Sequence, residues 1–281
     1  MVLPEKNEVL FYMNADVIIL GLVQGLTEFL PVSSSGHLAL AQIFLGTNMP
    51  PLSYDLVLHM ATALATIIFF FADIFALFVQ WLSGFRSKDA RKSSGWSTGW
   101  AVVSGTVITA VIGLTLKDFA EVAMMNSLMV GCGLTFTGFL LLFSSFVKTG
   151  LGRVRLTDGV IVGIAQGIAV MPGISRSGMT IVAGLMSGLS KEEAFRFSFL
   201  LSIPAILGAT LIQAMELGGW RTFVAALPPY WYVGAFAAFA SGFFALVLLR
   251  RIVLSSKWWI FGLYCLILGI SVITATYMGA W

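Results

Sequence analysis

The chain has 281 residues, of which 58% are hydrophobic and only 10% are charged, with a mean hydropathy of +0.95 and a formal net charge of +3. Soluble domains carry about 25% charged residues, so this composition excludes an ordinary soluble protein. The apolar runs are long and lack the alternation of outer-membrane strands, which predicts an all-α integral membrane protein. No basic cluster contains interleaved aromatic residues, so we expect no nucleic-acid partner.

The predicted elements follow one another in two similar series. Residues 15–46 form an apolar segment interrupted by "LPVSSSGH", and three spans follow at roughly 57–82, 98–116 and 126–147. Residues 158–188, interrupted by "MPGISRSGM", precede spans at 195–214, 229–249 and 258–277. Each half of an interrupted segment is too short to cross about 30 Å of hydrocarbon. We therefore predict six transmembrane helices and two re-entrant helical hairpins.

The loop charges are informative about sidedness. If each hairpin returns to its own side, twelve of the 16 Lys and Arg residues lie in loops on one side, three lie on the other, and Arg176 lies in the second hairpin. Lys and Arg are in excess on the cytoplasmic side, so both termini are predicted outside. The alternative is that each hairpin crosses the membrane fully, which gives a different distribution of the loops between the two sides.

The two hairpins are related in sequence. When residue n is aligned with residue n+142, eight of 26 positions are identical, among them the pairs Gln24/Gln166 and Ser33/Ser175. We predict a single membrane domain, 1–281, made of one repeat at 15–147 and a second at 158–277. Because each repeat crosses the membrane three times, an odd number, the second repeat is inverted relative to the first. The hairpin tips should then meet near the midplane, where inverted-repeat membrane proteins place their sites.

Three aligned positions differ in a chemically informative way. They are Glu28, Ser34 and His37, which are aligned with Val170, Arg176 and Met179 of the second segment. A serine hydroxyl needs an adjacent base to act as a nucleophile, and both Glu28 and His37 are candidates for that base. Gln24 lies four residues before Glu28, on the same helix face. The serines open a helix, whose free N–H groups and dipole favour an anion.

The second hairpin contributes positive charge. Arg176 offers a planar fork that matches phosphate oxygens. The predicted substrate-binding set from both hairpins is Gln24, Ser33, Ser35, Gly36, Ser175, Ser177, Gly178 and Thr180. Together the tips predict a phosphate pocket inside the membrane, which a phosphate ester or anhydride with a lipid tail reaches from the bilayer.

Other polar residues in the apolar segments have simpler interpretations. Ser33 and Ser35 alone would be interpreted as packing residues. His59 is expected to be structural, and Asp55 is expected to cap the start of its span. Glu28 and Arg176 differ, because ionisable residues at membrane depth are functional by default.

At these residues the chain resembles the undecaprenyl-diphosphate phosphatases of the bacitracin-resistance type. The likeness is densest in "QGLTEFLPVSSSGH" and "PGISRSGMT", with support from "YDLVLHMAT". The resemblance implies removal of the terminal phosphate of a C55 polyprenyl diphosphate, which recycles the carrier lipid of cell-wall glycans. It also implies a multi-pass protein of the plasma or inner membrane, a site open to the outer face, and a divalent cation, Mg²⁺ or Ca²⁺. The expected partners are the lipid substrate and the bilayer, and a homodimer is an open expectation.

The resemblance also assigns roles to matched positions. Glu28 corresponds to the essential carboxylate and is a provisional metal ligand, Ser34 to the proposed nucleophile, and His37 to the histidine that assists it. Arg176 corresponds to the phosphate-binding arginine, with Ser175 and Thr180 beside it. Gln24 stands where the family often has a second glutamate, which puts metal coordination at that position in question because an amide oxygen is a weaker ligand.

Two other functions fit parts of the pattern. Paired re-entrant hairpins in an inverted repeat are also transporter architecture, so a polyprenyl-phosphate flippase or an anion or lipid transporter is the main alternative, alone or combined with phosphatase activity. The clustered Glu, Ser and His favour the enzyme, because transport does not require them. A phosphatidic-acid-type phosphatase is disfavoured, because its nucleophilic histidine follows the Ser-Arg element, whereas His37 and His59 both precede it.

Two mechanisms are open for the phosphatase. Direct attack by water on the terminal phosphorus, with Ser34 as a ligand only, competes with a covalent mechanism in which Ser34 attacks.

Overall fold

The computed structural model describes residues 6–45, 51–255 and 257–279, and its regular structure is helical apart from one isolated β-bridge between Gly152 and Leu189. The first half contains α1 (Lys6–Phe29), α2 (Ser34–Leu45), α3 (Pro51–Phe69), α4 (Phe71–Arg86), the 3₁₀ turn η1 (Ala90–Lys92), α5 (Ser94–Met124) and α6 (Ser127–Ser144). The second half contains α7 (Leu156–Ile168), α8 (Arg176–Met186), α9 (Lys191–Glu216), α10 (Trp220–Ala225), α11 (Trp231–Leu254) and α12 (Trp259–Tyr277). The predicted all-α class is confirmed.

Long apolar helices make this a multi-pass membrane protein. Among the described residues, α5, α6, α9, α11 and α12 are each long and apolar enough to cross a bilayer, and the bent pair α3–α4 makes a sixth span if it is counted as one. Their surfaces expose large apolar side chains, such as Phe75 on α4 and Val111 on α5. A surface of this kind requires a hydrocarbon environment.

The predicted span at 57–82 is broken in the middle. Helices α3 and α4 meet at an angle of 76° on either side of Phe70. The local sequence, "TIIFFFADIF", contains neither proline nor glycine, so the bend has a tertiary cause. Phe70 is buried, and its ring lies 5.8 Å from that of Phe195 and 6.3 Å from that of Phe199 on α9. Packing of this side chain into the core holds the chain at the bend.

The two interrupted segments form the helix pairs α1–α2 and α7–α8, as predicted. The first limb is longer than predicted, because α1 begins at Lys6 rather than near residue 15. At 1.5 Å per residue its 24 residues extend about 36 Å, so the expectation of two short limbs is wrong for α1. Gly46, the last residue of the predicted first hairpin, lies outside the described residues.

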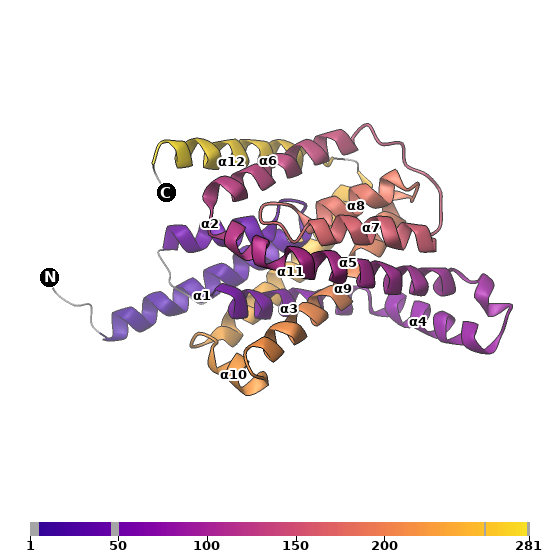
Figure 1. The fold of residues 1–281 in the computed structure, drawn as a ribbon, viewed down its shortest axis with the longest axis horizontal. Coiled ribbons are helices and arrows are strands. Elements are labelled where there is room, and N and C mark those ends of the chain that lie inside the picture. The colour runs from indigo at the N-terminus through magenta and orange to yellow at the C-terminus, as the bar shows by residue number, and fades with distance from the viewer. Residues whose placement is uncertain (1–5, 46–50, 256, 280–281) are drawn as a thin grey trace.

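Each hairpin packs against a long helix of the other half. Helix α1 lies along α11, α7 lies along α5, and α6 pairs with α12, as Figure 1 shows for the last pair at the top of the view. Glycines allow the close approach. A Cβ at Gly21 would lie 2.2 Å from the Gly234 carbonyl oxygen, and one at Gly163 would lie 2.7 Å from the Cα atom of Gly105. The first-half hairpin therefore meets the second half in the same way that the second-half hairpin meets the first.

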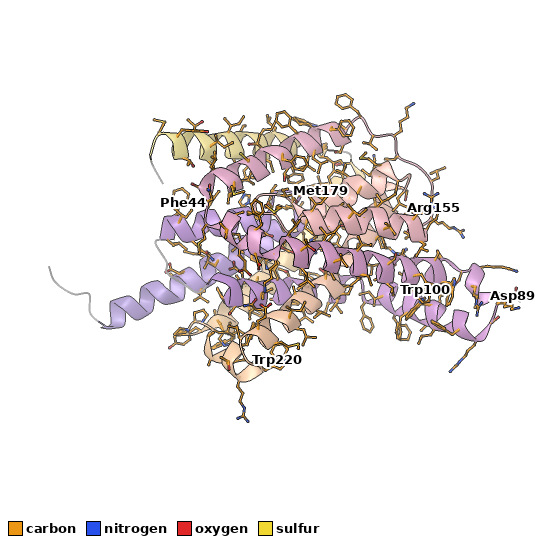
Figure 2. The ribbon with its side chains drawn as sticks, in the orientation of Figure 1. Phe44, Asp89, Trp100, Arg155, Met179 and Trp220 are labelled. Carbon is orange, nitrogen blue, oxygen red and sulfur yellow. The ribbon has the colours of Figure 1, made fainter. Side chains whose placement is uncertain are left out.

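The connections separate into two ends of the molecule. The α4–α5 and α6–α7 connections lie at one end, and the beginning of α1 and the end of α12 lie at the other (Figure 1). Asp89 and Arg155 mark the first end in Figure 2, and Phe44 lies toward the second. The hairpin tips lie between the two ends.

Candidate active site at the hairpin tips

The first tip is a short turn with a strained residue. Helix α1 ends at Phe29 and α2 begins at Ser34, and Ser33 between them has a φ of 70°, in the left-handed region that non-glycine residues seldom adopt. Its hydroxyl oxygen accepts a hydrogen bond from the Gly36 N–H at 3.3 Å, and its carbonyl accepts one from the His37 N–H at 3.2 Å. These bonds offset the strain and aim the start of α2 at the site.

The second tip repeats this hydrogen-bond pattern. Ser175 caps α8 by accepting from the Gly178 N–H at 3.1 Å, and its hydroxyl lies 3.2 Å from that of Ser177. The equivalent pair in the first tip, Ser33 and Ser35, has the same 3.2 Å separation. The identical serines and glycines of the two segments thus make the same hydrogen bonds at the starts of α2 and α8, although Ser33 has a φ of 70° and Ser175 a φ of -73°.

Helix α6 holds the second tip in place. The Thr137 hydroxyl donates to the Gly173 carbonyl at 2.9 Å and accepts from the Ser175 N–H at 2.9 Å. Gly173 has a φ of +80° and lies directly against α6, where a Cβ would be 2.3 Å from the Val130 carbonyl oxygen. Only glycine fits this position.

The two tips touch each other. The Ser177 hydroxyl donates to the Leu30 carbonyl at 3.3 Å, and a Cβ at Gly36 would lie 3.3 Å from the Cα atom of Gly173. Arg176, the first residue of α8, forms an ion pair with Glu28 near the end of α1. The structure therefore brings together the carboxylate and the guanidinium that the sequence placed on separate hairpins.

Glu28 is the centre of the site. Its side chain is only 2% exposed, and its Oε1 atom contacts Arg176 Nη2. Its Oε2 atom accepts hydrogen bonds from the Ser34 hydroxyl at 2.6 Å and from the Gln24 amide at 2.9 Å. A carboxylate removed from water in this way needs such partners, because an unpaired buried charge costs several kcal/mol.

Ser34 has the geometry of an activated nucleophile. Its hydroxyl donates to a carboxylate that can take the proton, and the residue is partly exposed, whereas Ser33 is buried. It is also the first residue of α2, where backbone N–H groups lack helical acceptors and attract an anion. Nucleophile, base and anion-binding N–H groups therefore meet at one point.

The His37 ring makes its hydrogen bonds to groups other than Ser34. Its Nδ1 atom lies 2.8 Å from the Ser33 carbonyl oxygen, so Nδ1 carries a proton, and its Nε2 atom lies 2.7 Å from the Tyr264 hydroxyl of α12. The two rings stack with centroids 5.7 Å apart. In this arrangement His37 stabilises the strained tip, and Glu28 rather than His37 is the group in position to accept the Ser34 proton.

The sequence alone indicates a structural role for His59, yet its ring lies at the site. Its Nε2 atom is 3.4 Å from Glu28 Oε2. The expectation that Asp55 caps its span is wrong, because α3 begins at Pro51, four residues earlier. The buried Asp55 carboxylate accepts from the Gln42 amide at 3.3 Å and ties α3 to α2. No local sequence signal separates His59 from any other helical residue, because the contact depends on how α3 packs beside α1.

The predicted catalytic and substrate-binding residues at the starts of α2 and α8 fall into two groups. Ser34 and Ser35 are partly exposed at the start of α2, and the side chain of Arg176 is 19% exposed. Ser175, Ser177 and Thr180 are buried, and their hydroxyls are bonded within the protein. Thr180, for example, lies 2.6 Å from the Ser198 hydroxyl of α9. In the structure these three serve the shape of the second tip.

The residues present suit a divalent cation only in part. The described ranges contain no group of three or more His, Cys, Asp or Glu side chains that could hold a metal ion. Gln24, however, is fully buried beside Glu28, and its Oε1 atom has no hydrogen-bond partner among the residues that the structure describes. One carboxylate and one amide oxygen fit a cation that takes its remaining ligands from substrate phosphates and water, as Mg²⁺ commonly does.

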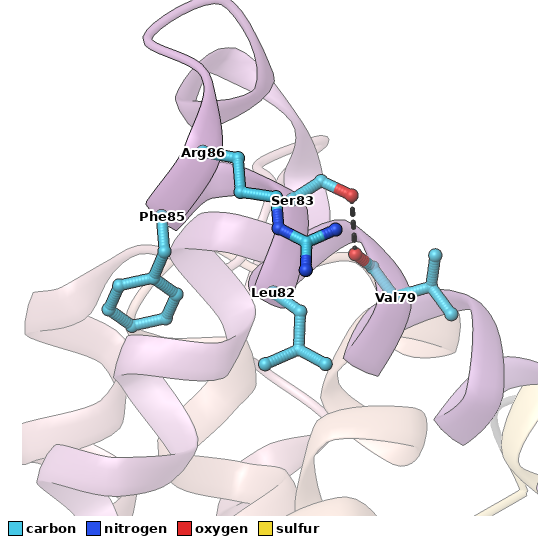
Figure 3. A pocket seen from close by; sticks show the side chains of 5 residues that line it. All are labelled: Val79, Leu82, Ser83, Phe85 and Arg86. Carbon is cyan, nitrogen blue, oxygen red and sulfur yellow. Dashed lines mark hydrogen bonds between the residues drawn. The ribbon is translucent and has the colours of Figure 1, made fainter.

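A separate pocket lies on α4. It is lined by Val79, Leu82, Ser83, Phe85 and Arg86, and the Ser83 hydroxyl within it donates to the Val79 carbonyl at 2.8 Å (Figure 3). This pocket contains none of the hairpin residues and no carboxylate. The candidate site is therefore defined by the contacts of the tips and not by this hollow.

Comparison with known proteins shows the family of the chain. The sequence model of the bacitracin resistance protein BacA family matches residues 17–271. An undecaprenyl-diphosphatase of Syntrophotalea carbinolica is 41% identical over 256 residues, which cover 90% of this chain and 95% of that relative. One from Desulfosudis oleivorans is 42% identical over 264 residues, with 90% and 94% covered. One from Korarchaeum cryptofilum is 38% identical over 265 residues, with 92% and 98% covered. The chain belongs to the BacA family.

Proposed function

We propose that this protein is an undecaprenyl-diphosphatase, which hydrolyses the terminal phosphate of a polyprenyl diphosphate and so returns the carrier lipid as its monophosphate. The observation that carries the proposal is the 2.6 Å hydrogen bond from Ser34 to Glu28, beside Arg176. Relatives named for this activity match nearly the whole chain. A lipid transporter needs an anion-binding arginine but has no use for a serine held against a base.

In the mechanism, Arg176 and the first N–H groups of α2 and α8 hold the phosphate oxygens. Ser34 Oγ attacks the terminal phosphorus, and Glu28 accepts its proton. The bond from that phosphorus to the bridging oxygen breaks, and the former bridging oxygen takes the proton from Glu28, so that the lipid monophosphate leaves and Glu28 is again a carboxylate. Water then cleaves the phosphoserine, with Glu28 as the base, and releases phosphate. Charge neutralisation and positioning supply most of the rate in phosphoryl transfer.

Glu28 and the free Oε1 atom of Gln24 would hold a divalent cation together with the diphosphate. When bound, Mg²⁺ or Ca²⁺ would neutralise phosphate charge. The other predicted ligands of the substrate, Ser35 and Gly36, lie at the same helix start. Ser33, Ser175, Ser177, Gly178 and Thr180 support the two turns that present these groups.

For the architecture, we propose two re-entrant hairpins and six spans in an inverted repeat, 15–147 and 158–277. The matched tip hydrogen bonds support this, as do the reciprocal contacts of α1 with α11 and of α7 with α5. The end that carries the basic α4–α5 and α6–α7 connections would face the cytoplasm. The site would then open to the outer face of the plasma membrane.

The test uses purified protein in detergent with undecaprenyl diphosphate and follows phosphate release. The wild-type protein is compared with Arg176→Ala, Arg176→Lys and wild type with a chelator. We expect loss of release in all three arms, with Arg176→Lys impaired because lysine cannot form the planar fork. Release by Arg176→Ala at the wild-type rate would refute the proposed site. Phosphate release in the presence of the chelator would refute only the proposed requirement for a divalent cation.

A further inference from the structure

We propose that the pocket near the end of α4 binds an anionic phospholipid of the surrounding bilayer, with the lipid phosphate against Arg86 and one acyl chain along α4. The pocket contains no residue of the two hairpin tips, so this binding is independent of the proposed function.

Aromatic rings locate the pocket at the membrane surface. Three of the eight tryptophans of the chain, Trp81, Trp96 and Trp100, lie together where α4 ends and α5 begins. The ring of Phe85, which lines the pocket, is 5.4 Å from that of Trp81 and 5.1 Å from that of Trp96. Tryptophan is enriched at the level of the lipid headgroups, where its ring meets both hydrocarbon and water. The pocket therefore lies at headgroup depth.

The face of α4 that leads to the pocket is not covered by any described part of the chain. On its other side α4 packs against α5 and η1. The uncovered face is a stripe of large exposed side chains at helical spacing: Phe71, Phe75, Phe78, Val79 and Leu82. From Phe71 to Leu82 the stripe extends about 16 Å at 1.5 Å per residue, which is about half the thickness of the hydrocarbon core. It is therefore long enough for an acyl chain of one leaflet.

The positive charge at the pocket is unpaired. Within the described ranges the Arg86 guanidinium has no hydrogen-bond or ion-pair partner, and Figure 3 shows it above Leu82. Lys88, two residues later, is also exposed and has no partner among the same residues. A guanidinium binds phosphate oxygens with its planar fork. Cations beside apolar walls suit a phosphate group that carries apolar chains.

The neighbouring charges are already used by the protein. Arg91 donates to the Gly84 carbonyl at 2.9 Å and lies 5.5 Å from the centre of the Trp96 ring. Asp89, the only acidic residue of this connection, pairs with Lys92 at 2.9 Å. Arg86 and Lys88 thus keep their charge for an outside ligand. A zwitterionic headgroup would bring its own cation toward them, so an anionic headgroup fits better.

Two other occupants fit less well. Inorganic phosphate would leave the apolar walls of the pocket in water. A second copy of the chain would meet this surface with the same surface, as two-fold contacts do, and would place its own Arg86 and Lys88 near those of the first copy. An anionic phospholipid satisfies both the charge and the apolar stripe.

The test is native mass spectrometry of the delipidated protein in detergent, titrated with phosphatidylglycerol or with phosphatidylcholine of the same acyl chains. We expect phosphatidylglycerol to bind at least fivefold more tightly. Arg86→Gln combined with Lys88→Gln should raise its Kd about 10- to 30-fold, about fivefold for each basic residue, and should change that of phosphatidylcholine less than twofold. The matched control is Lys148→Gln with Arg153→Gln, which removes two exposed cations from the α6–α7 connection and should change neither Kd more than twofold.

A second pair of variants tests the apolar wall. Leu82→Gln should raise the Kd of phosphatidylglycerol about 3- to 30-fold, whereas Leu114→Gln, a similarly exposed change on α5, should not. Equal losses from the two double variants would overturn the proposal, because the charge would then act without a site. Equal affinity for the two phospholipids would also overturn it, as would tighter binding of undecaprenyl phosphate or inorganic phosphate that depends on Arg86. So would a dimer that Leu82→Gln converts to monomers, because α4 would then be a contact between copies.

Discussion

Replacing Glu28 by glutamine removes the proposed base with almost no change of shape. The amide oxygen can still accept a hydrogen bond from Ser34, but it cannot take the proton, so we expect kcat to fall about 10²- to 10⁴-fold. The change also breaks the ion pair with Arg176. A fully buried pair would cost about 3–5 kcal/mol, and since the Arg176 side chain keeps some water at 19% exposure, we expect about 1–3 kcal/mol.

The assay is phosphate release under saturating undecaprenyl diphosphate, with thermal unfolding measured on the same preparations. Asp158→Asn is the matched control, because Asp158 is a fully buried carboxylate paired with Arg155 away from the site. This variant should lose stability while its folded fraction keeps its turnover. Glu28→Gln with more than a tenth of the wild-type kcat would refute the argument that Glu28 is the base.

Three further substitutions test the scaffold. Gly21→Ala should lower the free energy of unfolding by about 1–3 kcal/mol, because its Cβ would lie 2.2 Å from the Gly234 carbonyl oxygen. Gly208→Ala is the control and should leave the free energy of unfolding unchanged, because there is open space around Gly208. Equal unfolding curves for the two variants would contradict the packing of α1 against α11. Thr137→Val removes both bonds to the second tip and should cost about 1–3 kcal/mol and lower phosphate release, unlike Thr135→Val, whose hydroxyl bonds only within α6. Tyr264→Phe removes the partner of His37 Nε2 and should cost about 0.5–1.5 kcal/mol with less than a tenfold loss of kcat, relative to the exposed Tyr277→Phe. A kcat loss as large as that of Glu28→Gln would make the His37 side chain part of the chemistry.

The sequence was sufficient to predict most of the helices and to single out two charged residues that lie together in the structure. Long apolar runs predicted the spans, and interruptions by Pro, Gly and Ser predicted both turns. The alignment of the two hairpins singled out Glu28 and Arg176, and the structure brings them into contact. These features are local, or follow from a comparison of one segment with another.

Features that depend on packing between distant segments could not be predicted. The bend at Phe70 has no proline or glycine to announce it and arises where the ring meets Phe195 and Phe199. His37 was expected to assist Ser34 because both lie near the start of α2. Its ring instead joins α12 through Tyr264, 227 residues later in the chain. His59 reaches Glu28 only because α3 lies beside α1.

In the proposed mechanism Ser34, held against Glu28 between the two tips, attacks the terminal phosphorus. The most direct measurement compares phosphate release from undecaprenyl diphosphate by the wild-type protein and by Ser34→Ala, at equal amounts of folded protein and with cation present. We expect Ser34→Ala to retain less than about 1% of the wild-type rate, because the covalent route is lost. A Ser34→Ala rate above about a tenth of the wild-type rate would contradict attack by Ser34. So small a loss would mean that Ser34 is only a ligand and that water is the nucleophile.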